Sequence, residues 1–242
     1  VNVLFVLKHP MGKLPASLLK AGGARVYVIS DDSRMYYEGF GLKTVARLRL
    51  GVDTKTFHPV SIKEKTALRN KYGIRQDVKV ILHVGHMSSG RNVEKLLDVR
   101  SDHQVLLVIS SATEEDRALR NKLEARGNIR IIDEYVPSIQ ELYQLSDIYL
   151  FPVTEMENCI DMPLSVLEAG ACGIPVITTA YEGAKELAGS PGFWLIDDLS
   201  KEKLNDCIDK VLAQVNFYDH SFIEGYDWDV AADRLIRDNT EV

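Results

Sequence analysis

The sequence predicts an α/β protein built around a parallel β-sheet with helices on both faces. Short runs rich in β-branched residues alternate along the chain with stretches of helical pattern. The helical stretches are about ten residues long, which suits right-handed βαβ crossovers between parallel strands. The 242 residues, 45% hydrophobic and 26% charged, have the composition of a globular chain with a sizeable core. This composition excludes disorder as the main state.

The first fifty residues predict three strands and two short helices. The strands are expected at 1–7, 25–30 and 45–50. The first helix, 14–20, ends at a pair of glycines, and the second runs to Tyr37 from the capping residues Asp31, Asp32 and Ser33. Residues 51–61 are rich in Gly, Pro and polar residues, which predicts a linker between two domains.

The alternation continues after the linker with six further strands. These strands are expected at 78–84, 104–110, 129–132, 148–151, 175–178 and 193–196. Helices are expected at 62–72, 91–98, 114–126, 137–145, 164–171, 183–187, 201–215 and 227–238. Ligands of parallel sheets bind at the carboxyl ends of the strands, near a topological switch point. We therefore expect the ligand site among the loops that follow Val84, Ser110, Ile132, Phe151 and Thr178.

The net charge and the cysteine content indicate which binding partners and which cellular compartment to expect. The formal net charge of −6 argues against non-specific nucleic-acid binding, which needs a basic surface. The odd number and spacing of Cys159, Cys172 and Cys207 fit neither a zinc site nor a disulfide framework, so we expect a reduced, cytoplasmic setting. The longest apolar runs, about eight residues, are far below the roughly 20 that span a bilayer. The chain has no signal peptide at its start and opens at Val1 without methionine, so we expect a processed chain or a fragment.

The loop at 85–90 is the first candidate for chemistry. It is rich in glycine and serine and joins a predicted strand to a predicted helix. Free N–H groups and the positive end of a helix dipole would make an anion site there, to which His86 and Arg91 add donors. Neither the dinucleotide fingerprint nor the P-loop pattern is present. The alternative is a tight strand-to-helix turn that carries a surface arginine.

The second candidate is the acidic segment 154–175. Glu155, Glu157, Asp161 and Glu168 fall within it, and Glu168 lies on an otherwise apolar helix. A buried carboxylate needs a partner, and ligand hydroxyls could provide one. The alternative is a glutamate at the helix end that faces solvent or a lysine.

Other positions give weaker signals. The helix at 182–187 is a third anion-site candidate, and residues 110–111 with Tyr135 and Val136 lie at other strand ends, where they could flank a ring. His9 follows the first strand and lies at its ligand-facing end, whereas His83 lies within a strand and is expected to be a satisfied core residue. No catalytic triad or nucleophile elbow is evident.

Five segments taken together resemble one family. They resemble, in the same order, the donor-binding domain of GT-B glycosyltransferases of the retaining type known as glycosyl transferases group 1. The segments are 50–59 (LGVDTKTFHP), 84–92 (VGHMSSGRN), 142–152 (LYQLSDIYLFP), 164–176 (LSVLEAGACGIPV) and 226–235 (YDWDVAADRL). The fourth is the most specific match, and the resemblance extends over about residues 26–238.

This resemblance implies transfer of a sugar from a nucleotide-sugar to an acceptor, with retention of configuration and without a metal or other cofactor. The family's diphosphate-neutralising Arg and Lys fall on His86 and Arg91, and its ribose-binding glutamate falls on Glu168. The glutamate that contacts the donor sugar in the family falls on Ile160, so Asp161 or Glu157 would have to replace it. The implied catalytic residues are His86, Arg91, Glu157 and Asp161. The implied donor-binding residues are Gly85, Ser88, Ser89, Tyr135, Val136, Leu164, Glu168, Glu182 and Gly183.

The implied domains are a reduced or incomplete Rossmann-like acceptor-side domain at 1–51, a donor-binding domain at 52–217 and a C-terminal helix at 218–242 that packs back toward the N-terminal part. His9 and Gly12 would lie on the acceptor side. The acceptor would be a carbohydrate, a lipid-linked molecule or a small molecule. A shortened N-terminal domain would leave apolar surface exposed. This predicts contact with a membrane surface or with a second chain, identical or different.

Two functions stay open at this point. The chain is either an active hexosyltransferase-like enzyme, or a nucleotide-sugar-binding module without catalysis, such as one subunit of a split transferase. The absence of a glutamate at Ile160 and the short N-terminal domain favour the binding module. Arg91 and Glu168 indicate only that donor binding persists. A flavodoxin-like regulatory or redox domain is disfavoured by the five ordered segments.

Overall fold

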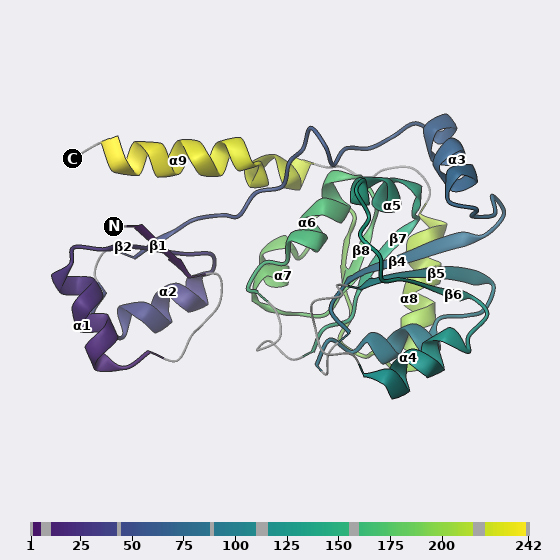
Figure 1. Ribbon diagram of the computed structural model, residues 1–242, viewed down its shortest axis with the longest axis horizontal. Helices are drawn as coiled ribbons and strands as arrows, with labels where there is room; N and C mark the ends of the chain where they lie inside the picture. The colour runs from purple at the N-terminus through teal and green to yellow at the C-terminus, as the bar shows by residue number, and fades with distance from the viewer. Residues whose placement is uncertain are drawn as a thin grey trace.

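The computed structural model describes residues 2–5, 11–42, 45–87, 90–109, 116–154, 160–214 and 221–240. They form two lobes, each with its own parallel sheet (Figure 1). We call residues 2–50 the N-lobe and residues 62–213 the C-lobe. Within the described ranges, no helix is both long enough and apolar enough to cross a bilayer.

The N-lobe holds three parallel strands in the order β1-β2-β3. These are β1 (Asn2–Phe5), β2 (Arg25–Val28) and β3 (Val45–Arg47), with helices α1 (Lys13–Ala21) and α2 (Asp31–Glu38). Ser30 caps α2, because its hydroxyl accepts a hydrogen bond from the Ser33 backbone N–H at 3.0 Å. The expected cap at residues 31–33 is therefore wrong, since Asp31, Asp32 and Ser33 already lie in the first turn.

The C-lobe holds six parallel strands in the order β6-β5-β4-β7-β8-β9. They are β4 (Lys79–Gly85), β5 (His103–Ile109), β6 (Ile129–Ile132), β7 (Ile148–Phe151), β8 (Val176–Thr178) and β9 (Phe193–Leu195). The chain builds outward from β4 through β5 to β6 and then returns to β7 on the other side of β4, where Ile81 pairs with Ile148. The topological switch point therefore lies between β4 and β7.

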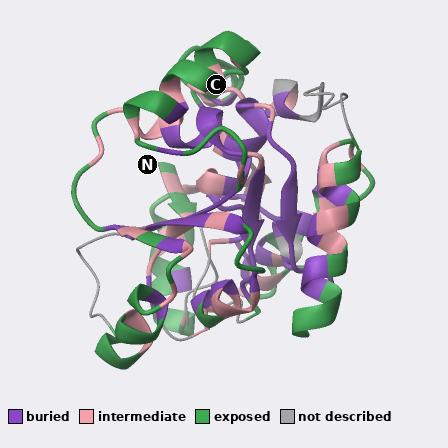
Figure 2. Cartoon of the chain, turned by 90° about the vertical axis from the view of Figure 1, so that its right-hand side faces the viewer, coloured by how far each residue is buried: buried purple, intermediate pink, exposed green. Residues whose placement is uncertain are grey.

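Helices cover both faces of this sheet. They are α3 (Ile62–Lys71), α4 (Arg117–Glu124), α5 (Ile139–Leu145), α6 (Leu164–Ala171), α7 (Glu182–Leu187), α8 (Lys201–Ala213) and the 3₁₀ helix η1 (Val93–Asp98). Successive residues of β4 are buried on opposite faces of the sheet. Val80 and Leu82 pack with α5 and α6 on one face, whereas Ile81 packs with η1 and α8 on the other. Figure 2 shows the buried strands between helices whose outer faces are exposed. The expected parallel α/β fold with helices on both faces is confirmed.

The last helix joins the two lobes. After the 3₁₀ helix η3 (Ser221–Tyr226), α9 (Trp228–Thr240) runs back over the N-lobe (Figure 1). Ala231 and Leu235 of α9 pack against Tyr27 and Leu48 of the N-lobe. At the crossing point a Cβ on Gly51 would lie 2.4 Å from the backbone nitrogen of Trp228, so only glycine lets the linker and α9 approach this closely.

The structure differs from the sequence prediction at two short helices. The helix predicted at 91–98 is present with the same end, but it is the 3₁₀ helix η1, which begins after Asn92 adopts a left-handed backbone conformation with φ 52°. The η3 turn was not anticipated, because its sequence has no helical periodicity. Among the cysteines, Cys172 and Cys207 are free thiols, while Cys159 lies outside the described residues.

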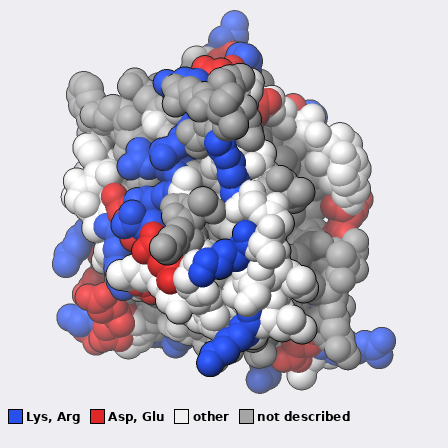
Figure 3. Space-filling model, turned by 90° about the vertical axis from the view of Figure 1, so that its left-hand side faces the viewer, with Lys and Arg blue, Asp and Glu red and all other residues white. Residues whose placement is uncertain are grey.

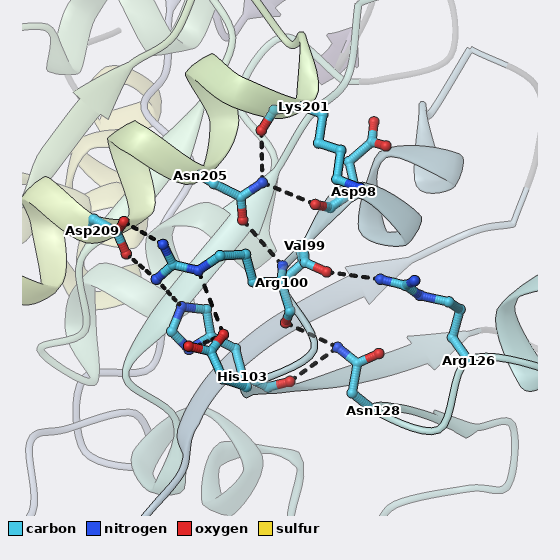
Figure 4. A network of polar contacts seen from close by, with 10 residues as sticks. Asp98, Val99, Arg100, His103, Arg126, Asn128, Lys201, Asn205 and Asp209 are labelled. Carbon is cyan, nitrogen blue, oxygen red and sulfur yellow. Dashed lines mark hydrogen bonds and ion pairs between the residues drawn. The ribbon is translucent and has the colours of Figure 1, made fainter.

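A polar network at the far end of the sheet fixes α8 to the turn before β5 (Figure 4). The buried amide of Asn205 accepts a hydrogen bond from the Arg100 backbone N–H at 3.1 Å and donates to the carbonyls of Asp98 and Lys201. The Arg100 guanidinium pairs with both oxygens of Asp209 on the same helix. The network therefore satisfies backbone groups that no regular element would pair.

Replacing Asn205 with alanine should lower the free energy of unfolding by about 1–3 kcal/mol, because the Arg100 N–H and the Asp98 carbonyl lose their partner where water is excluded. Urea unfolding of the variant measures this loss. Asp206→Ala, on the exposed face of the same helix, is the matched control and should change stability little. Equal losses in both variants would contradict the role of the network.

Candidate functional site

The candidate site lies at the switch point, where the loop after β4 meets the segment after β7. Asn92 donates a hydrogen bond from its side-chain amide to the Thr154 hydroxyl at 2.7 Å, which ties the two segments together. The guanidinium carbon of Arg91 lies 5.8 Å from the centroid of the Phe151 ring, within cation–π distance. Residues from the carboxyl ends of β4 and β7 thus meet where α/β sheets bind ligands.

Arg91 supplies a positive charge at the switch point. It is partly buried, and no carboxylate in the described part of the chain pairs with it. Its Nε is fully buried without a hydrogen-bond partner among the described residues. Burial and the charge of Arg91 both lower the pKa of His86, which is therefore neutral near neutral pH. His86 can donate or accept a hydrogen bond here, and Arg91 carries the permanent charge.

The loop leads into the short 3₁₀ helix η1, which begins at Val93, and not into an α-helix that begins at Arg91. Gly90, with φ 84°, and Asn92 instead turn the chain through two left-handed residues. Ser88 and Ser89 lie outside the described residues.

His83 lies directly beneath this loop. Its Nδ1–H donates to the Leu150 carbonyl at 2.8 Å, and its ring stacks on Tyr149 and Phe151. The other ring nitrogen, Nε2, is buried without a partner in the described structure, 3.1 Å from where a Cβ on Gly85 would be. The expectation of a fully satisfied core histidine is therefore wrong for one of its two nitrogens. Burial, aided by Arg91 and opposed by the bond to Leu150, lowers the pKa of His83 to about 4.

This shift predicts a pH dependence of stability. Between about pH 4 and 6.5 the unfolded chain protonates His83 while the folded chain does not, so folding stability should rise with pH across this window and be complete above it. The contribution is on the order of 3 kcal/mol. We expect His83→Phe, which keeps a stacked ring, to flatten the pH dependence of unfolding measured from pH 4 to 7. An unchanged slope in the variant would contradict this assignment.

Glu168 lies on α6 near the same end of the sheet and is mostly buried. Tyr143 donates its hydroxyl to one Glu168 carboxylate oxygen at 2.7 Å. Burial raises the pKa of Glu168, and the Tyr143 bond opposes part of this rise. The alternative of a glutamate that faces solvent or a lysine is therefore wrong, because the partner is a tyrosine hydroxyl. Leu164, at the start of α6, packs against the core of the C-lobe.

Asp161 lies at the junction between the two lobes. Its side chain is buried, and one carboxylate oxygen accepts hydrogen bonds from the hydroxyls of Ser30 and Ser33 at the start of α2. The Gly183 N–H donates to the Asp161 carbonyl at 2.9 Å, and a Cβ on Gly183 would lie 2.2 Å from that oxygen. The Gly183 N–H is thus used within the protein. No sequence pattern indicated the contact with Ser30 and Ser33, since the residues are more than a hundred positions apart.

The remaining candidates are dispersed. Tyr135, after the edge strand β6, is 87% exposed, and Val136 packs against the core. Gly12 precedes α1 at the surface of the N-lobe. His9 and Glu157, the side chain of Glu182, and residues 110–111 lie outside what the structure describes. No three His, Cys, Asp or Glu side chains in the described ranges gather as a group that could hold a metal ion.

These features define a two-lobed parallel α/β protein with an arginine at the switch point of its larger sheet. The family described as glycosyl transferases group 1 matches residues 64–225, which is more than half of the chain. The chain therefore belongs to the glycosyl transferases group 1 family.

A curated relative and two solved structures agree with this assignment. A GDP-mannose-dependent monoacylated alpha-(1-6)-phosphatidylinositol monomannoside mannosyltransferase of Corynebacterium glutamicum is 25% identical over 229 residues, which cover 86% of this chain. The match spans 60% of that relative's length.

The fold is similar to a glycosyltransferase of Rickettsia africae, with a TM-score of 0.83 and 17% identity over 99% of this chain and 70% of that one. It is also similar to HepE of Anabaena in complex with UDP and glucose, with a TM-score of 0.80 and 14% identity over 100% of this chain and 71% of that one. The GT-B fold expected from the resemblance is confirmed.

Proposed function

We propose that this chain binds a nucleotide-sugar in the crevice between β4 and β7 and takes part in transferring the sugar to an acceptor. The observation that carries the proposal is the guanidinium of Arg91, which stands over Phe151 at the switch point without a carboxylate partner in the described part of the chain. A diphosphate would supply two negative groups that can pair with this partly buried guanidinium.

The proposed roles follow from the contacts. Arg91 stabilises the charge that builds on the departing nucleotide diphosphate, and neutral His86 donates a hydrogen bond to it. Glu168 has one oxygen engaged by Tyr143 and can accept ribose hydroxyls with the other. Retention of configuration and independence from metal or other cofactors are part of this proposal, and the family resemblance supports them. The acceptor would enter from the N-lobe side.

A second candidate function is donor binding without catalysis. Ile160 occupies the position of the family's sugar-contacting glutamate, and the neighbouring Asp161 carboxylate is held by Ser30 and Ser33. An acid engaged in this way is less available to position a sugar. Turnover rather than binding distinguishes the two functions.

The test is a titration with a panel of nucleotide-sugars that includes GDP-mannose and UDP-glucose, with thermal shift and release of free nucleotide recorded together. Binding stabilises the folded state by mass action, so the true donor should raise the melting temperature as its concentration rises. Glu168→Gln and Arg91→Gln should lose the shift, whereas Arg75→Gln, a surface arginine paired locally with Asp77, should keep it. A shift without nucleotide release supports the second function, and no shift with any nucleotide contradicts both.

A further inference from the structure

A second group of arginines surrounds a pocket at the lobe junction, away from the switch point. The pocket lies between residues 47–49 and α9 and has a volume of about 310 Å³. Arg47 and Arg49 line one side of it, and Arg234 of α9 lines the other. The size is at the lower end of the range for small-molecule sites.

Two of the three guanidinium groups are held in position by other side chains. Arg49 lies over the ring of Tyr226, with its guanidinium carbon 5.4 Å from the ring centroid. Its Nη1 is so close to Gly225 that a Cβ there would lie 3.1 Å away. Arg47 is paired with Asp31 at 3.1 Å and with Glu186 of the C-lobe. An anion that enters the pocket would therefore meet donors that are already ordered.

The charges at the pocket are not balanced. Asp31 and Glu186 are engaged with Arg47, while neither Arg49 nor Arg234 has a carboxylate partner among the residues described. The Nε of Arg47 is also buried without a hydrogen-bond partner in these ranges. The pocket thus keeps unused donors of the planar, forked kind that bind phosphate best.

The N-lobe, which forms one side of the pocket, has an excess of basic residues. Residues 1–50 contain eight Lys and Arg against three Asp and Glu, although the whole chain carries a net charge of −6. Figure 3 shows Lys and Arg side chains across the middle of the face that the N-lobe presents, with Asp and Glu side chains among them. Such a field raises the local concentration of anions. Leu48 and the half-exposed Val230 add an apolar wall to the pocket.

We propose that this pocket binds the phosphate group of an organic phosphate ester, through the guanidinium groups of Arg49 and Arg234. The apolar wall selects an ester over inorganic phosphate. The ester is either a soluble sugar or polyol phosphate or the headgroup of a phospholipid, since both present the same chemistry. The site is separate from the donor crevice, where Arg91 provides the charge.

The test uses protein with Arg91→Gln, so that the donor crevice contributes no phosphate binding. Glycerol 1-phosphate is titrated by calorimetry at fixed ionic strength, and vesicles of phosphatidylcholine with and without phosphatidic acid are tested by sedimentation. Adding Arg49→Gln and Arg234→Gln should weaken binding of at least one probe tenfold or more. The matched control is Lys55→Gln, an exposed lysine at the same junction that pairs with Asp229 and does not line the pocket.

Binding of glycerol 1-phosphate that the double substitution removes supports the site with a soluble ligand. Binding of the acidic vesicles alone, removed in the same way, supports it with a lipid headgroup. Binding to neither probe, or binding that Lys55→Gln weakens as much as the double substitution does, overturns the proposal. The protein with Arg49→Gln and Arg234→Gln alone should still respond to the nucleotide-sugar panel, so failure of this site and failure of the donor site are separate results.

Discussion

Replacing Arg91 with glutamine should lower the rate of sugar transfer by about 10²–10³-fold, the usual loss when one donor to a developing negative charge is removed. The substitution removes the guanidinium that lies over Phe151 at the switch point and, with it, the positive charge there. Neutral His86 cannot replace it near neutral pH. Glutamine keeps much of the side-chain volume, which limits the change to charge and hydrogen bonding.

The measurement is the initial rate of nucleotide release over a range of concentrations of the donor that the panel identifies. Arg75→Gln should retain the rate of the unaltered protein. Arg91→Lys should recover part of the rate, because it restores a charge without the forked geometry of guanidinium. A rate within threefold of the unaltered protein in Arg91→Gln would contradict the assignment of Arg91 to the departing diphosphate.

Replacing Asp147 with alanine should destabilise the fold by about 3–5 kcal/mol, the range expected when a buried charge loses its partner. The Asp147 carboxylate accepts hydrogen bonds from Lys65 at 2.8 Å, from Arg69 at 2.6 Å and from the Val80 backbone N–H at 2.7 Å. The Arg69 side chain is only 7% exposed and would be left with an uncompensated charge. Because these hydrogen bonds join α3 to β4 and β7, the substitution should destabilise the whole C-lobe.

Urea unfolding followed by far-UV circular dichroism measures this effect. The control is Asp77→Ala, which breaks an ion pair with Arg75 whose side chains are about 70% exposed, and it should cost well under 1 kcal/mol. Burial alone would raise the pKa of Asp147, but Lys65 and Arg69 outweigh it and lower the pKa. The contribution should therefore be complete above the ordinary carboxyl pKa and be lost as the pH falls through the lowered one. A loss below 1 kcal/mol at neutral pH would show that the pair is not a main support.

The order of strands and helices could be predicted from the sequence because each element has a local signature. The runs of β-branched residues identified β6 and β7 with their observed ends, and the apolar helix around Glu168 has the predicted limits of α6. The 3₁₀ geometry of η1 could not be predicted, because it depends on the left-handed backbone of Asn92. Local propensity does not determine such a turn.

The candidate site could also be predicted only in part. The positions of Arg91 and Glu168 near the sheet's carboxyl edge follow from the pattern of parallel strands. The partners of these residues cannot be predicted from that pattern. Phe151, Tyr143 and the ring of His83 reach the site through packing across the sheet. The contact of Asp161 with Ser30 joins the two lobes and has no local signal at all.

The path of α9 also bears on the order in which the protein forms during synthesis. All six strands of the C-lobe precede α9 in the sequence, so that lobe can complete its sheet while later residues are still inside the ribosome. The N-lobe is synthesised first, yet Tyr27 and Leu48 gain their cover only when Ala231 and Leu235 arrive. Of the two lobes, the one that is made earlier is therefore finished later, and until α9 arrives the apolar face formed by Tyr27 and Leu48 stays uncovered on the nascent chain.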